Sequence, residues 1–146
     1  MSSAFYPDSG FLVSLVCNDT NSSEACSIMG KLMKPLVFTA LHRIEVRNAL
    51  RNISARCLID QDDRKAAFRR IEEDLKEGLL INAPIDWANV LRKADELSDT
   101  HSSKDGHRTI DLLHVAIAFE CGATTFLTFD KRQRGLAKAV GLKVIP

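Results

Sequence analysis

Five short apolar segments alternate with longer amphipathic stretches along the 146 residues, and this alternation constrains the fold more than any other feature. Short apolar runs bounded by turn residues are typical of buried strands, and a 3.6-residue apolar period is typical of helices. Strands that alternate with helices form a mostly parallel sheet covered on both faces. We therefore expect a three-layer α/β/α sandwich, with strands at residues 3–6, 36–38, 79–81, 125–128 and 142–145.

The helices are delimited by capping residues and by glycine or proline stops. We expect them at about residues 11–17, 25–33, 40–56, 60–76, 86–97, 110–121 and 130–140. Thr39 and Thr109 are expected to cap the third and sixth of these helices. The stretch 98–106 is polar and has no apolar period, so it is expected to be a loop.

Length and composition indicate one soluble domain over residues 1–146, because no linker, repeat or low-complexity tract interrupts the chain. Twenty basic and nineteen acidic side chains nearly balance, so any basic binding surface has to be local. The four cysteines form no C-x-x-C pair, which favours reduced, mostly buried thiols in a cytoplasmic protein. No apolar run is long enough for a membrane span and the N-terminus lacks a signal-peptide pattern, so no membrane association is expected.

Three aspartates lie at the starts of predicted helices, where capping alone explains each of them. Asp8 and Asp130 follow predicted strands, and an aspartate just before a helix commonly accepts a backbone N–H. Asp111 lies in a first helical turn, where the helix dipole favours a negative charge. The carboxyl ends of parallel strands are also where ligands bind in α/β sheets. Capping and ligand binding therefore both stay open for these residues.

Glu45 is harder to explain by capping, because it lies in the middle of the predicted helix 40–56. Its spacing to Leu41, Ile44 and Ala49 predicts that it lies on the apolar face. A buried ionised carboxylate requires an ion pair or a metal ion. If these four carboxylates converge, their mutual repulsion favours a bound cation, and hard oxygen ligands favour Mg²⁺ or Mn²⁺, ions that commonly act on phosphates.

Four segments in this order resemble the PIN domain family, and most closely the VapC-like toxin ribonucleases of bacterial toxin–antitoxin pairs. They are residues 6–9 (Tyr-Pro-Asp-Ser), 39–50 around Glu45, 111–118 (Asp-Leu-Leu-His-Val-Ala-Ile-Ala) and 126–130 (Phe-Leu-Thr-Phe-Asp) with the closing segment 141–144. The resemblance implies a metal-dependent endoribonuclease of PIN-like fold. Its metal ligands and catalytic residues would be Asp8, Glu45, Asp111 and Asp130, with Ser9 and Thr128 orienting carboxylates or water around them.

The chemistry that the resemblance implies is attack of ion-activated water on the phosphorus of RNA, which needs no protein nucleophile. It also implies an antitoxin protein as partner and a homodimer. Two alternatives are a non-catalytic PIN-like module that binds RNA or a protein, and a haloacid-dehalogenase-type phosphatase. The phosphatase would need a D-x-D motif, and Gly10 occupies the position of the second aspartate.

Basic side chains near the acidic residues are candidates for contacts with RNA phosphates. Arg43 and Arg47 belong to an i, i+4 stripe on the helix of Glu45, and Lys131 and Arg132 directly follow Asp130. A solvated helix face or internal salt bridges explain these residues equally well. Among the histidines, we expect His114 to be hydrogen-bonded and partly buried, and His42, His101 and His107 to lie on the surface or in loops.

Overall fold

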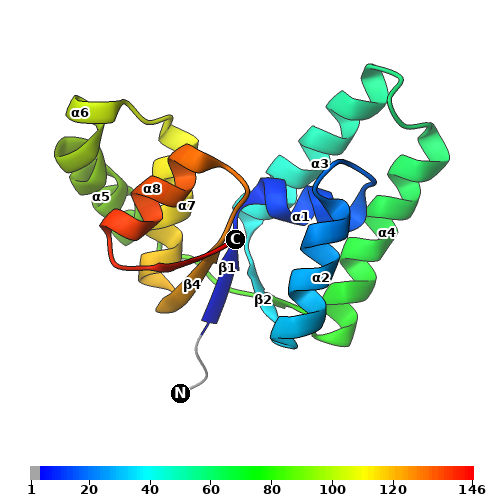
Figure 1. The fold of residues 1–146 in the computed structure, drawn as a ribbon, viewed down its shortest axis with the longest axis horizontal. Coiled ribbons are helices and arrows are strands. Elements are labelled where there is room, and N and C mark those ends of the chain that lie inside the picture. The colour runs from blue at the N-terminus through cyan, green and yellow to red at the C-terminus, as the bar shows by residue number, and fades with distance from the viewer. Residues whose placement is uncertain (1–3) are drawn as a thin grey trace. The chain divides into compact units, whose positions relative to one another are not determined.

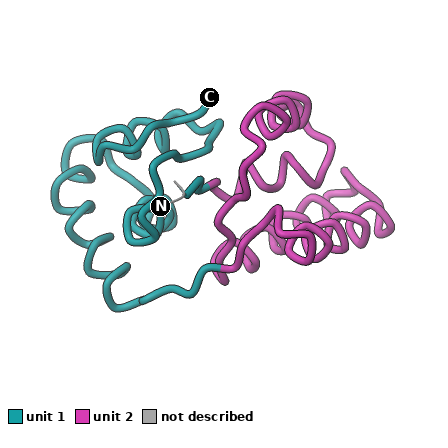
Figure 2. Tube along the Cα trace, turned by 90° about the horizontal axis from the view of Figure 1, so that it is seen from below, with its two compact units in different colours: residues 1–6, 83–146 teal, residues 7–82 magenta. Residues whose placement is uncertain are grey.

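The structure of the protein is a computed structural model that describes residues 4–146. The strands among these residues are β1 (Ala4–Pro7), β2 (Leu36–Phe38), β3 (Leu80–Asn82), β4 (Ala123–Leu127) and β5 (Lys143–Ile145). They form one sheet in the order β3-β2-β1-β4-β5. The chain divides into two compact units, one of residues 7–82 and the other of residues 1–6 and 83–146 (Figure 2).

The unit of residues 7–82 contains four helices and two short parallel strands. Its elements are α1 (Ser9–Val16), α2 (Ser22–Leu32), β2 (Leu36–Phe38), α3 (Ala40–Ala55), α4 (Gln61–Glu77) and β3 (Leu80–Asn82). The parallel pairing of β2 with β3 places Leu36 opposite Leu80. Helices α3 and α4 pack against each other (Figure 1).

Side-chain caps set the helix starts in this unit. The carboxylate of Asp8 accepts from Phe11 N at the start of α1, and Thr39 caps α3 as predicted. Helix α2 is an exception, because its N-cap residue Asn21 makes no side-chain cap hydrogen bond. Gly78 ends α4 with φ of 79°, a conformation that glycine adopts without strain.

The unit of residues 1–6 and 83–146 holds the helix of Asp111 and the strand that leads to Asp130. Its elements are most of β1 (Ala4–Pro7), then α5 (Trp87–Leu97), the π-helix η1 (Ser98–Ser102), α6 (Ser103–Asp105), α7 (Thr109–Glu120), β4 (Ala123–Leu127), α8 (Lys131–Ala139) and β5 (Lys143–Ile145). Strands β4 and β5 pair in parallel, and α5 packs on α7 (Figure 1). The core of this unit stacks the ring of Tyr6 on that of Phe126 at a centroid distance of 5.5 Å.

Most predicted elements are present within one or two residues, and the predicted strand 3–6 appears as Ala4–Pro7, with Ser3 outside the described residues. Two expectations in the second unit are wrong. The stretch 98–106 is mostly helical rather than a loop. Thr109 is the first residue of α7 and not its cap, because Arg108 holds the N-cap position.

The cysteines are free thiols, but they are less buried than expected. Cys26 and Cys57 are exposed, while Cys17 and Cys121 are half-buried. Burial and, to a smaller degree, the nearby Glu120 charge raise the pKa of the Cys121 thiol, which keeps it protonated. No helix in the described part of the chain is both long and apolar enough to cross a bilayer.

Candidate active site

Asp8 is a buried helix cap in the unit of residues 7–82. The residue is only 9% exposed, and its Oδ1 accepts a hydrogen bond from the backbone N of Phe11 at 2.7 Å. The capping interpretation of Asp8 is therefore correct for one carboxylate oxygen. Capping uses only part of the acceptor capacity of a carboxylate, so it is compatible with binding a cation.

Glu45 lies on the flank of α3 and not on its buried face. The buried face consists of His42, Val46 and Leu50, whereas Ile44 is 58% exposed. The buried face of α3 is therefore rotated around the helix axis relative to the predicted apolar face, and Glu45 is half-buried. The hydroxyl of Ser9 donates to Glu45 Oε1 at 2.8 Å. This contact is of the kind expected for a hydroxyl that orients a carboxylate.

His42 is fully buried, which contradicts the surface location expected for it. Its Nδ1 lies 3.0 Å from the backbone N and 2.9 Å from the hydroxyl of Thr39, forming a capping box at the start of α3. Its Nε2 lies 2.8 Å from the carbonyl oxygen of Pro7. A T-x-x-H sequence in place of the usual T-x-x-E was the signal that sequence inspection missed.

Asp111 lies in the first turn of α7, in the other unit, and is 8% exposed. The guanidinium of Arg108 binds both of its carboxylate oxygens, with Nε 2.9 Å from Oδ2 and Nη2 3.1 Å from Oδ1. The Arg108 side chain itself is 68% exposed. Arg108 is therefore a largely exposed cation bound to a nearly buried carboxylate. The sequence did not reveal this pairing.

Asp130 is an exposed cap of α8, and its Oδ1 accepts from Arg132 N at 2.8 Å and Gln133 N at 3.0 Å. Thr128 is fully buried, and its hydroxyl accepts from the backbone N of Asp130 at 3.0 Å. Thr128 therefore orients the backbone of Asp130 and not its carboxylate in this contact.

Gln133 is a second buried polar residue that sequence inspection missed. Its backbone N donates to Asp130, and its side-chain Nε2 donates to the carbonyl oxygen of Asp111 at 3.3 Å. It is 2% exposed. Gln133 thus links the two helices that carry the carboxylates of this unit.

His114 lies one turn after Asp111 and is hydrogen-bonded as expected, but at 2% exposure it is fully rather than partly buried. Its Nδ1 is 2.7 Å from the hydroxyl of Tyr6. The two rings meet edge to face at a centroid distance of 5.8 Å. His114 therefore supports the core of its unit.

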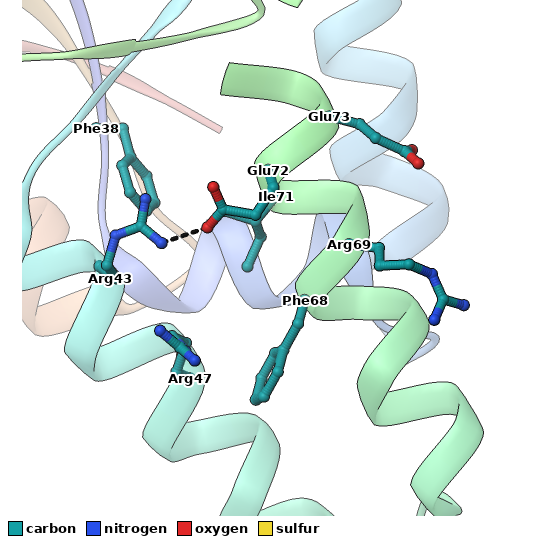
Figure 3. Close-up of a pocket in the computed structure, with 8 residues that line it drawn as sticks. All are labelled: Phe38, Arg43, Arg47, Phe68, Arg69, Ile71, Glu72 and Glu73. Atoms are coloured by element: carbon teal, nitrogen blue, oxygen red, sulfur yellow. Dashed lines mark hydrogen bonds and ion pairs between the residues drawn. The ribbon is translucent and has the colours of Figure 1, made fainter. Parts of the chain in front are cut away.

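Two of the candidate basic residues line a cleft of about 330 Å³ between α3 and α4 (Figure 3). Arg43 pairs with Glu72 and lies over the ring of Phe38, while Arg47 lies over the ring of Phe68 at 5.1 Å. The pairing of Arg43 with Glu72 matches the internal-salt-bridge alternative, whereas Arg47 makes a cation–π contact. Lys131 and Arg132, in contrast, are exposed in the first turn of α8.

The four carboxylates fall into two pairs, one in each unit: Asp8 with Glu45, and Asp111 with Asp130. Within residues 4–146, no group of three or more His, Cys, Asp or Glu side chains is arranged as a metal site. The side chains are nevertheless of the chemical type that Mg²⁺ and Mn²⁺ prefer, since all four are carboxylates. Asp8 and Asp111 are also largely withdrawn from water, and the charge of Asp111 is paired with that of Arg108.

Comparison with protein families matches residues 5–139 to the PIN domain. The chain belongs to the PIN domain family. The match spans both carboxylate pairs and most of each unit, and it confirms the resemblance found in the sequence.

The PIN fold is also shared with a solved structure of low sequence identity. The crystal structure of FitAcB from Neisseria gonorrhoeae is 16% identical, with a TM-score of 0.67 over 97% of this chain and 96% of that one. This likeness confirms the predicted α/β/α class with its mostly parallel sheet. No curated protein matches the chain.

Proposed function

We propose that this PIN domain is a Mg²⁺- or Mn²⁺-dependent endoribonuclease. The family match, which covers all four acidic positions, is the observation that carries this proposal. In it, Asp8, Glu45, Asp111 and Asp130 bind the ion and are the catalytic residues. A bound divalent ion would supply charge stabilisation at the phosphodiester and activation of water.

The contacts within each unit support this assignment, because neighbours orient the carboxylates of Asp8 and Glu45 and the backbone of Asp130. Oriented ligands lose less conformational entropy when they bind an ion. Ser9 holds Glu45, and the start of α1 holds Asp8. Thr128 fixes the backbone from which Asp130 extends.

For the RNA substrate, we propose phosphate contacts by Lys131, Arg132, Arg43 and Arg47. Lys131 and Arg132 are the stronger candidates, because their side chains are exposed beside Asp130. Arg43 would have to leave its ion pair with Glu72 to reach a phosphate. Phosphate contacts of this kind position the substrate and carry no sequence information.

We further propose, from the VapC-like motifs, that the protein is a cytoplasmic toxin. Its partners would be a cognate antitoxin protein and a second copy of the same chain. Two of the four motif segments, residues 40–50 and 111–118, lie within the helices α3 and α7. A non-catalytic module that binds RNA or a protein is the competing function.

The first test is RNA cleavage with and without divalent ions. Purified protein is expected to cleave single-stranded or structured RNA with Mg²⁺ or Mn²⁺, to lose the activity with a chelator, and to regain it when Mn²⁺ is restored. The measurement is the cleavage rate of end-labelled RNA on a denaturing gel. Binding of RNA without cleavage under all ion conditions would instead support the non-catalytic module.

Arg108 is expected to compete with the ion, because its N–H groups bind both oxygens of Asp111. Arg108→Gln should therefore raise the affinity for Mn²⁺ by roughly fivefold, the factor equivalent to about 1 kcal/mol for an exposed ion pair. Isothermal titration calorimetry of the purified protein measures this affinity.

Arg70→Gln is the matched control for Arg108→Gln. Arg70 pairs with Asp74 in the same manner, with side-chain exposures of 59% and 14% against 68% and 12% for Arg108 and Asp111. It should leave the Mn²⁺ affinity unchanged. A lower affinity in Arg108→Gln would contradict competition and would show that Arg108 orients Asp111 for the ion.

A further inference from the structure

His42 connects two segments of the unit of residues 7–82 through both of its ring nitrogens. The ring is fully buried and stacks on Phe38, with centroids 5.7 Å apart and an interplanar angle of 18°. Nδ1 lies 3.0 Å from Thr39 N, and Nε2 lies 2.8 Å from the carbonyl oxygen of Pro7. Hydrogen bonds of this kind are what allows a polar side chain to be so deeply buried.

The two partners of His42 fix its protonation state. A backbone N–H can only donate, so Nδ1 must accept from Thr39. A carbonyl oxygen can only accept, so Nε2 must carry the hydrogen that Pro7 receives. His42 is therefore neutral and in the Nε2–H tautomer, which gives it one acceptor and one donor on opposite sides of the ring.

The contact with Pro7 bears directly on Asp8, the next residue in the chain. Pro7 has a restricted φ and no N–H, so its carbonyl is its only backbone hydrogen-bonding group. One turn further along α3, Glu45 accepts from the hydroxyl of Ser9. Helix α3 thus holds the residue before Asp8 and the residue after it, through side chains at i and i+3 that are neighbours on the helix surface.

We propose that His42 is a positioning residue, which fixes the backbone of Asp8 so that its carboxylate can bind the divalent ion. The inference rests on the proposed function, because it assumes that Asp8 is a metal ligand. We infer that the contact with Pro7 sets the affinity for the ion, and that the capping box with Thr39 does not. The two contacts use different ring nitrogens and can therefore be removed separately.

Three variants separate the contacts. His42→Asn keeps an acceptor near the place of Nδ1 and loses the donor to Pro7, whereas His42→Gln keeps a donor near the place of Nε2 and loses the acceptor. Thr39→Val removes the capping hydroxyl and leaves His42 in place. Titration calorimetry with Mn²⁺ gives the affinity, and thermal unfolding without added metal gives the stability of each variant.

The expected result is that the Mn²⁺ affinity and the unfolding temperature respond to different substitutions. His42→Asn should lower the Mn²⁺ affinity on the order of 10-fold, as for other groups that orient a ligand. His42→Gln and Thr39→Val should unfold at lower temperature, because a cap is lost, yet keep the affinity of the wild type. If affinity instead falls in step with the unfolding temperature across the three variants, His42 is only structural and the proposal is overturned.

Two further outcomes are decided by the same measurements. If His42→Asn does not fold by circular dichroism, the other two variants still test the proposal: retained affinity supports it, and a 10-fold loss in either overturns it. If the wild type binds no Mn²⁺, the proposed function has failed. If the wild type and a folded His42→Asn bind Mn²⁺ equally, only the role of His42 has failed.

Discussion

Asp111→Asn is expected to reduce RNA cleavage by about 100-fold or more, since loss of a ligand should exceed the 10- to 100-fold cost of losing a supporting residue. The substitution preserves the size of the side chain and removes its charge, so the affinity for Mg²⁺ or Mn²⁺ should fall as well. Folding should be little affected, because the partner Arg108 is exposed and can be solvated by water. Cleavage rates at several Mn²⁺ concentrations measure both effects.

Asp74→Asn is the control for this prediction, since Asp74 is also a nearly buried carboxylate paired with an exposed arginine. Arg70 donates a hydrogen bond to Asp74, and this bond and the charge of Asp74 raise the pKa of Arg70. It lies on α4, outside the four segments that contain the proposed metal-binding carboxylates. Cleavage by Asp74→Asn should match the wild type. Full activity of Asp111→Asn would remove Asp111 from the site and with it the metal-binding assignment.

Phe126→Ala is expected to lower the free energy of unfolding by about 4 kcal/mol, within the range for deleting a buried aromatic ring. Phe126 is fully buried on β4 and stacks on Tyr6, whose hydroxyl contacts the buried His114. The loss therefore includes the ring's own burial and the packing of its neighbour. Urea denaturation followed by circular dichroism measures the change.

Phe119→Ala makes the same chemical change at an exposed site and should cost about 1 kcal/mol or less. Phe119 is 46% exposed, and its main described contact is the ammonium of Lys93, 4.0 Å from the ring centroid. Similar losses in the two variants would mean that Phe126 does not anchor the core of its unit.

The sequence predicted the strands and most helices because apolar runs, apolar periods and stop residues are local features of the chain. It misplaced the buried face of α3 because a hydropathy pattern treats histidine as polar, whereas His42 is buried by two hydrogen bonds. Exchanging the apolar Ile44 for His42 on the inner face displaces Glu45 to the flank. Hydrogen-bond partners distant in sequence cannot be recognised from periodicity.

The helical stretch after α5 was mispredicted for a different reason. Residues 98–105 are polar on all sides, which resembles a loop in composition. They contain no proline or glycine, so nothing ends the helix that precedes them until Gly106, whose φ is 65°. The π-helical hydrogen bonds of Ser98–Ser102 are a change in winding that composition does not encode.

For the candidate site, contacts local in the chain were predictable and contacts distant in the chain were not. Capping was one of the two interpretations that the sequence left open for Asp8 and Asp130, and both carboxylates do cap helices. The pairing of Arg108 with Asp111 is also local, but an arginine before a helix has too many possible partners to assign. Gln133 contacts Asp111 across 22 residues, which only the folded chain reveals.

The order of the carboxylates along the chain has a consequence for synthesis on the ribosome. The unit of residues 7–82 contains Asp8 and Glu45, while the other two proposed ligands, Asp111 and Asp130, belong to the second unit. If all four are required, a nascent or truncated chain has only half of the ligands until residue 111 is translated and the full set only after residue 130. Nuclease activity would then appear late in translation, so an incomplete copy of this chain would leave the RNA of its own cell intact.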